Sequence, residues 1–113
     1  MSNDIDEIVN KIVEFRNERN WAQFHSLKDL LLGLNIEVGE LQELFLWKSD
    51  SEIENVDVSK IENEIADISI FLIYICNHFN IDLLKAITEK IDINSQKYPV
   101  EKSRNSNKKY TEL

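Results

Sequence analysis

The sequence predicts an all-α fold, and three observations lead to that prediction. Only two Gly and one Pro occur among the 113 residues, so the chain has little of the turn chemistry that a β-sheet requires. Apolar residues recur at steps of three and four in four separate segments, which is the spacing of amphipathic helices. The length and the hydrophobic fraction of 42% are those of a single soluble domain with one core.

Two helices are expected in the first half of the chain. The first runs from about Asp4 to Asn20, and its apolar face comprises Ile5, Ile8, Val9, Ile12 and Phe15. The connector NWAQFHS follows it, and either Ser26 or Asp29 is a suitable N-cap for the next helix. That second helix extends from about Leu27 to Trp47, and its apolar positions are Leu30, Leu34, Leu41, Leu44 and Phe45.

Two more helices are expected in the second half. The polar stretch Lys48–Ser59 breaks the periodicity and predicts a loop. The third helix, from about Lys60 to Phe79, is apolar most of the way round, which is typical of a helix buried on more than one face. The fourth helix begins at the N-cap Asp82 and ends near Tyr98, where Pro99 stops it. In so short a chain, the all-round apolar third helix predicts a subunit interface.

These segments form a helical domain over residues 1–98, followed by a polar tail over residues 99–113, and we expect a four-helix bundle completed by homo-oligomerisation. The net charge of −8 argues against nucleic acids and anionic membranes as partners. The lone Cys76 offers no disulfide framework. The acidic N-terminus does not resemble a signal peptide, and the longest apolar run, Ile70–Cys76, is too short to cross a bilayer. We therefore expect a cytoplasmic protein.

Two pairs of acidic residues lie at helical spacing beside the apolar faces. Residues three apart share a helix face, so Glu37 lies beside Glu40, and Glu64 beside Asp67. Like charges at this spacing destabilise a helix by roughly 0.2–0.5 kcal/mol in water. The neighbouring turns supply only one basic residue, Lys60, in the less favourable orientation relative to Glu64. The arrangement therefore costs stability unless a cation lies between the two pairs.

A hard divalent cation would remove this repulsion. Two antiparallel helices that each contribute one pair could bring four carboxylates to one or two ions, and Mg²⁺ prefers such oxygen ligands. Neither pair contains a His, which disfavours the carboxylate–histidine pattern of di-iron bundles and favours Mg²⁺ or Mn²⁺. The alternative is that the four acids are ordinary solvated surface, as we expect for Glu43.

The segments EVGE and EIAD resemble the acidic signature of the MazG-type all-α nucleoside triphosphate pyrophosphohydrolases, which is written E-E-x-x-E, then a spacer, then E-x-x-D. Ile36 stands where that signature has its first Glu, and the other four positions match. Three further segments are similar to the dCTP pyrophosphatase branch: W-x-Q-F-H before the acidic helix, F-x-W-K-S after it, and K-Y-P followed by S-R-x-S-x-K-Y-T in the tail. The resemblance extends over nearly the whole chain.

This resemblance implies Mg²⁺-dependent hydrolysis of a nucleoside triphosphate to the monophosphate and diphosphate, and with it control of the nucleotide pool. The metal ligands and catalytic carboxylates would be Glu37, Glu40, Glu64 and Asp67, with Glu40 or Glu37 taking the proton of the attacking water. It also implies a dimer of dimers. The nucleoside pocket would be formed by Trp21, Phe24, His25 and Trp47.

The residues themselves agree with part of this pocket. Trp47 is seven residues after Glu40, which on a continuous helix places it almost in line and about 10 Å away, a suitable distance between metal-bound phosphates and a stacked base. Two departures from animal members weaken the expectation of a cytosine base. Phe71 stands where they have Tyr, and Ile12 stands where they have a His at the pocket edge.

Further contacts to substrate are expected from the fourth helix and the tail. Asn94 falls on the apolar stripe of that helix and needs a polar partner, with Tyr98 one turn further on. Lys90 flanks the stripe and either reaches phosphate or stays solvated. Five of the thirteen basic residues lie between Lys97 and Lys109, and the resemblance implies that Arg104 and Lys109 fold over the triphosphate.

Two alternatives stay open. One is a related pyrophosphohydrolase that acts on dUTP or another pyrophosphate, such as a phosphoribosyl nucleotide. The other is a non-catalytic helical module for dimerisation or partner binding, in which the acids are solvated. Bases are discriminated by the shape of the pocket, which the sequence does not display.

Overall fold

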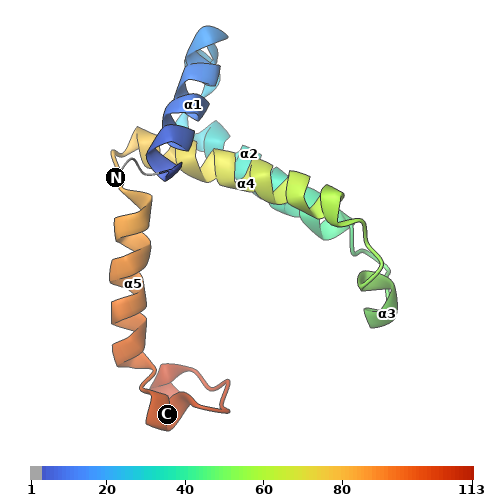
Figure 1. Cartoon of the computed structure of the whole chain (residues 1–113), viewed down its shortest axis with the longest axis vertical. Coiled ribbons are helices and arrows are strands. Elements are labelled where there is room, and N and C mark those ends of the chain that lie inside the picture. Colours follow the sequence, from blue (N-terminus) through green and yellow to red (C-terminus); the bar gives the residue numbers. More distant parts are fainter. Residues whose placement is uncertain (1–3) are drawn as a thin grey trace. The chain divides into compact units, whose positions relative to one another are not determined.

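The chain is described by a computed structural model, which covers residues 4–113 and contains helices but no strand within that range (Figure 1). The all-α prediction is therefore confirmed. The residues fall into two compact units, the first ending at Asn80 and the second comprising Ile81–Leu113. The expected boundary at residue 98 and the expected four-helix bundle stay predictions.

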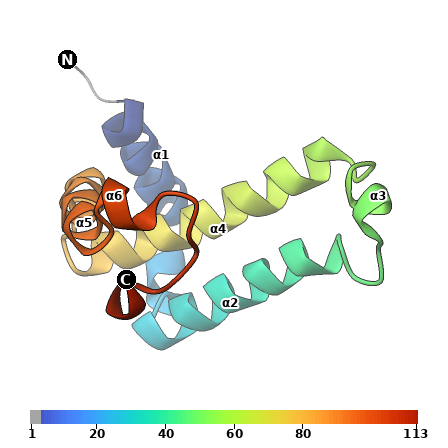
Figure 2. The ribbon, with the colours of Figure 1, turned by 90° about the horizontal axis from the view of Figure 1, so that it is seen from below.

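The first unit is built around an antiparallel pair of helices. Helix α2 (Leu27–Glu43) lies along α4 (Val58–His78), and α1 (Asp4–Glu18) contacts α4 (Figure 2). The short 3-10 helix η1 (Trp21–Phe24) connects α1 to α2. Both helices of the pair begin at a side-chain cap: the Ser26 hydroxyl accepts from the Asp29 backbone N–H, and Asp57 accepts from the Ser59 backbone N–H.

The core of this unit lies near the start of α2 and the later turns of α4. Leu30 is only 2% exposed, and Ile73 and Tyr74 are also buried. Gly33 lets the ring of Phe71 approach the α2 backbone, because a Cβ atom at Gly33 would lie only 2.6 Å from Phe71 Cζ. This close contact holds α2 and α4 together next to the buried residues.

Two sequence predictions about the following segment are wrong. Helix α2 ends at Glu43 and not at Trp47, since the next residues form three-residue turns such as Phe45 N–H to the Gln42 carbonyl, 3.0 Å. Trp47 itself adopts a left-handed backbone with φ of 64°. The expected loop contains the short helix α3 (Asp50–Ile53), which begins with a capping box of Ser49 and Glu52.

The second unit contains the fourth long helix and the tail. Helix α5 (Leu83–Lys97) begins at Asp82, which accepts from the Lys85 backbone N–H at 3.1 Å, as predicted. The polar tail, whose composition is typical of disorder, forms α6 (Val100–Ser103) and the 3-10 helix η2 (Tyr110–Glu112). Tyr110 packs edge-on against Tyr98 with ring centres 5.9 Å apart, and this contact ties the end of the chain to α5.

No single helix within residues 4–113 combines the length and the apolar character needed to cross a membrane; only α4 and α5 taken together, as a bent pair, meet that requirement.

Candidate metal centre

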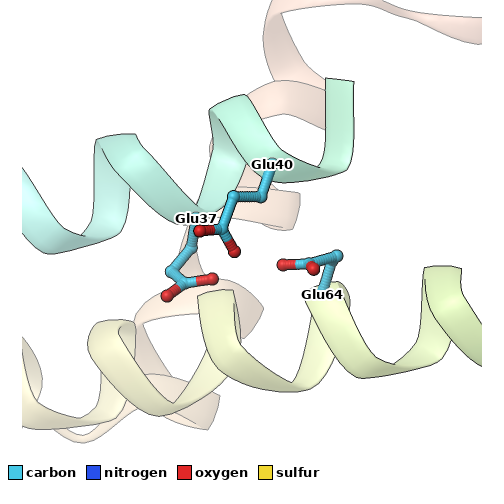
Figure 3. A group of neighbouring side chains, drawn as sticks. All are labelled: Glu37, Glu40 and Glu64. Atoms are coloured by element: carbon cyan, nitrogen blue, oxygen red, sulfur yellow. The ribbon is translucent and has the colours of Figure 1, made fainter. Parts of the chain in front are cut away.

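Three carboxylates meet between the two antiparallel helices of the first unit. Glu37 and Glu40 project from α2, and Glu64 projects from α4 toward them (Figure 3). One oxygen of each side chain lies within 4.8 Å of the others. The i, i+3 spacing of the α2 pair places both side chains on the face that meets α4, as the sequence predicts.

The electrostatics of this cluster are unfavourable without a cation. Burial, followed by the hydrogen bond and the negative charge of Glu40 and the charge of Asp67, raises the pKa of Glu37 from its ordinary 4.5 to about 7. The pKa of Glu64 is raised as well, first by burial and then by its contacts with Glu40. Both shifts mean that the folded chain resists placing full negative charge on these side chains.

Two oxygens of the cluster lack a partner. Glu37 Oε2 and Glu64 Oε2 are both buried, and neither accepts a hydrogen bond from any of the described residues. Buried carboxylate oxygens are normally satisfied by donors or by metal ions. Oxygen-only donors from several carboxylates are the set that Mg²⁺ prefers, with Mn²⁺ next, so the residues present fit a hard divalent cation.

Asp67 lies near the cluster but outside the group of three. It follows Glu64 by three residues on α4, and its negative charge raises the pKa of both Glu37 and Glu64. Its expected role as a fourth ligand stays a prediction. Glu43, which we expected to be solvated, is exposed at the end of α2.

The aromatic residues before α2 form a second cluster in the first unit. Trp21 packs edge-on against Phe15 at 5.6 Å, and Phe24 is 64% exposed. The centre of the His25 ring lies 4.7 Å from that of Tyr74, and its buried Nδ1 has no hydrogen-bond partner in the part of the chain that the structure describes. Phe71, whose ring centre is 6.5 Å from that of Tyr74, connects this cluster to the acidic one along α4.

Sequence reasoning missed two side chains in this second cluster. The Arg16 guanidinium lies 5.7 Å from the Tyr74 ring centre, and burial together with the charge of Arg16 lowers the pKa of His25. Tyr74 is buried, with its hydroxyl 3.5 Å from the Ile12 carbonyl oxygen. The position of Arg16, one turn after Ile12 on the same helix, was a signal available in the sequence.

Within one copy of the chain, Trp47 lies apart from Trp21, Phe24 and His25. Those three residues precede α2, whereas Trp47 follows its last turn and is 91% exposed. Because α2 ends at Glu43, the expected in-line separation of about 10 Å between Glu40 and Trp47 along one helix does not apply. A shared pocket of these four residues stays a prediction that requires a second copy of the chain.

The remaining predicted substrate contacts belong to the second unit. Tyr98 packs on Tyr110, and the other four side chains are exposed. Their contact with substrate stays a prediction; the four residues are Lys90, Asn94, Arg104 and Lys109.

Known proteins resemble this chain over most of its length. A model of the MazG-like family matches residues 32–113. The chain is 41% identical to dCTP pyrophosphatase 1 of Rattus norvegicus and 40% identical to that of Homo sapiens, in each case over 96% of this chain and 67% of the relative. Its fold matches the crystal structure of a pyrophosphatase from Archaeoglobus fulgidus with a TM-score of 0.82 and 34% identity, over 88% of this chain and 95% of that one.

These relatives confirm two predictions. Pyrophosphatases recur among both the similar sequences and the similar fold, so the chain is an enzyme of the pyrophosphatase type, a hydrolase of acid anhydrides. With a family model that covers residues 32–113 and with identities of 40–41% to curated members, the chain belongs to the MazG-like family.

Proposed function

We propose that the enzyme hydrolyses a nucleoside triphosphate to the monophosphate and diphosphate with the help of Mg²⁺, for which Mn²⁺ can substitute. The metal would be held by Glu37, Glu40, Glu64 and Asp67. The observation that carries the proposal is the acidic cluster itself: carboxylates of two helices converge with buried, unpartnered oxygens at Glu37 and Glu64.

The chain's own residues have defined tasks in this reaction. The oxygen of a water molecule bonds to the α-phosphorus, the bond from that phosphorus to the bridging oxygen breaks, and the diphosphate leaves with the bonding electron pair. Glu37 or Glu40 accepts the proton of the water. When bound, the divalent cation supplies positive charge that neutralises the phosphates and stabilises the charge of the transition state.

The substrate that fits best is dCTP or a modified dCTP, which gives the enzyme a role in cleaning the nucleotide pool. Support comes from relatives at 40–41% identity that are dCTP pyrophosphatases. The base would contact the aromatic cluster of Trp21, Phe24 and His25, in which the exposed rings of Trp21 and Phe24 offer stacking surfaces. Phe71 lacks the hydroxyl with which a Tyr would contact the base. A nucleotide with a related base, such as the uracil of dUTP, is therefore the alternative substrate.

The enzyme would act as a homo-oligomer in the cytoplasm, with a dimer of dimers as the expected assembly and with neither nucleic acid nor membrane as a partner. Large apolar side chains remain exposed on both helices that carry the carboxylates: Leu32, Ile36, Ile65 and Leu72. A second copy would cover such a surface, and could bring its Trp47 to the nucleoside pocket.

An assay of diphosphate release tests the proposal. Each common dNTP and dUTP is incubated with the protein, with and without Mg²⁺, and the Glu40→Gln variant is assayed in parallel. We expect turnover that requires the cation, is fastest with a cytosine nucleotide and is lost in the variant. Faster turnover of dUTP would favour the related enzyme. Failure to turn over any triphosphate or to bind Mg²⁺ would favour the non-catalytic module.

A further inference from the structure

An open cavity of about 430 Å³ lies in the first unit, where α2 ends and α4 begins. Its volume is within the range of small-molecule sites. The side chains around it come from the end of α2, the segment after α3 and the first turn of α4: Glu43, Leu44, Lys48, Asn55, Val56, Asp57 and Lys60.

Two lysines give this cavity its capacity to bind an anion. Neither Lys48 nor Lys60 forms a salt bridge with any residue between positions 4 and 113, although the chain carries a net charge of −8. Of the two acids in the cavity wall, Asp57 is committed to the cap of α4, because its Oδ1 accepts from the Ser59 backbone N–H at 3.0 Å and hydroxyl at 2.8 Å. In addition to hydrogen bonds from nearby serines, the charge of Lys60 lowers the pKa of Asp57, and the charge of Lys48 lowers the pKa of Glu52. Neither ammonium group is held in an ion pair by an acid of residues 4–113, so both remain within reach of an entering anion.

The cavity adjoins the acidic cluster. Lys60 precedes Glu64 by four residues on α4, which is about 6 Å of rise, and Glu43 follows Glu40 by three residues on α2, which is about 4.5 Å. The aromatic cluster lies in the opposite direction, because Trp21 and His25 precede α2. The first unit thus presents aromatic rings, carboxylates and lysines in that order along the α2–α4 pair.

A nucleoside triphosphate has groups in the same order: base, α-phosphate, then the two terminal phosphates. We propose that the cavity of Lys48 and Lys60 receives the terminal phosphates of the substrate and holds the leaving diphosphate; this inference rests on the proposed function. The lysines would neutralise the charge that develops on the departing oxygens. The Asn55 amide donates one hydrogen bond to the Ser51 carbonyl at 3.2 Å, and its second N–H would donate to the diphosphate.

The test uses the full chain with both lysines replaced, Lys48→Met with Lys60→Met, which removes the charges and keeps the aliphatic stems. The matched control is Lys11→Met with Lys28→Met, on exposed positions of α1 and α2 outside the cavity. Binding of imidodiphosphate, a diphosphate that resists hydrolysis, is measured by calorimetry in the presence of Mg²⁺. We expect its affinity to fall at least about tenfold in the cavity variant and to stay within about twofold of wild type in the control.

A second titration with the nucleoside monophosphate product locates the effect. If the cavity takes the diphosphate, affinity for the monophosphate is retained in the cavity variant, which also shows that this variant is folded. Equal loss for both ligands, unchanged imidodiphosphate affinity, or no imidodiphosphate binding by the wild type would overturn the inference. The two proposals can fail separately. If the wild type turns over triphosphates and the cavity variant binds imidodiphosphate as tightly as the wild type, the proposed function stands and only the role of the cavity is refuted.

Discussion

The two ends of the α2–α4 interface differ in how completely the chain satisfies them. At one end Leu30, Ile73 and Tyr74 are buried, and Phe71 fits against Gly33 so closely that a Cβ atom there would meet its ring. Toward the other end, Glu37 and Glu64 each have a buried oxygen to which no residue of positions 4–113 donates a hydrogen bond. Packing at the first end stabilises the helix pair, and this stability offsets the repulsion between like charges at the second.

Other acids of the first unit show that repulsion is not a general property of this acidic chain. Hydrogen bonds from Ser49 lower the pKa of Glu52, and hydrogen bonds from Ser59 lower the pKa of Asp57. These cap carboxylates find Ser donors nearby, whereas the hydrogen-bond partners of Glu37 and Glu64 are other carboxyl groups of the same cluster. The comparison teaches that the acidic cluster depends on something outside the chain, which is why its stability should respond to a cation.

The largest expected effect is on activity, from Glu64→Gln. The amide keeps the shape of the side chain and removes one negative ligand, so we expect turnover of the preferred triphosphate to fall by about 100-fold or more. The melting temperature of the metal-free variant should be equal to or higher than that of wild type, because one like charge is gone. Steady-state kinetics and thermal melting measure the two effects.

Glu62→Gln is the matched control for this variant, since Glu62 is an exposed acid of the same helix. It removes the same charge from the chain, and its activity should stay within about twofold of wild type. A Glu64→Gln enzyme as active as the Glu62→Gln enzyme would contradict the assignment of Glu64 to the metal.

The next effect concerns pH and Mg²⁺ together. The folded pKa of Glu37, about 7, exceeds its ordinary value of 4.5, so the folded state favours the protonated form. Stability of the metal-free protein should therefore fall as pH rises from about 4.5 to about 7, by roughly 1 kcal/mol once solvent screening is included. Mg²⁺ binds the ionised form, so its stabilising effect should be larger at pH 8 than at pH 5.

Chemical unfolding at both pH values, with Mg²⁺ and with a chelator, gives the four free energies of unfolding that are needed. The Glu37→Gln variant cannot titrate at this position and should lose most of the pH dependence. A wild type that is equally stable at both pH values, whether or not Mg²⁺ is present, would show that the acids are not mutually destabilising.

Most of this site follows from local sequence rules. The helical periodicity of the sequence places Glu37 beside Glu40 and identifies α4. The N-cap residues Ser26 and Asp82 identify the starts of two helices. The end of α2 was not predictable in the same way. The apolar run after Glu43 continues the helical pattern, and no Gly marks the stop, so only the turns and the left-handed Trp47 reveal it.

Features that depend on distant parts of the chain were also missed. Lys48 and Lys60 are twelve residues apart and meet around one cavity because α3 folds the intervening segment back. The capping box that starts α3, Ser49 with Glu52, is visible in the sequence and could have predicted that turn. How the second unit and a second copy of the chain contribute is set by long-range packing, which periodicity does not encode.

The two glycines of α2 have different surroundings, since Gly33 faces Phe71 of α4 and Gly39 faces open space. Gly33→Ala should destabilise the protein by about 1–3 kcal/mol, because the new Cβ atom collides with the Phe71 ring in a packed region. Gly39→Ala should stabilise it by about 0.5–1 kcal/mol, since nothing lies within 4 Å of the new Cβ atom and Ala is the better helix former. Urea unfolding of the two variants measures both changes, and effects of the same sign would refute the difference in packing.

The smallest expected effect comes from Glu52→Gln, at an acid that the chain itself satisfies. The Ser49 hydroxyl donates to Glu52 at 2.9 Å, and the lowered pKa of Glu52 means that the folded state favours its ionised form. Its contribution to stability is therefore present above pH 4.5 and is lost as pH falls through the folded pKa, the reverse of the slope expected for Glu37. We expect a loss of stability at pH 7 smaller than the gain from Gly39→Ala, a loss that shrinks as pH falls through the folded pKa, and no change in turnover or in stabilisation by Mg²⁺. If Glu52→Gln reduced the stabilisation by Mg²⁺ as much as Glu37→Gln does, cap acids and cluster acids would respond alike. That result would contradict the assignment of the acidic cluster as the metal centre.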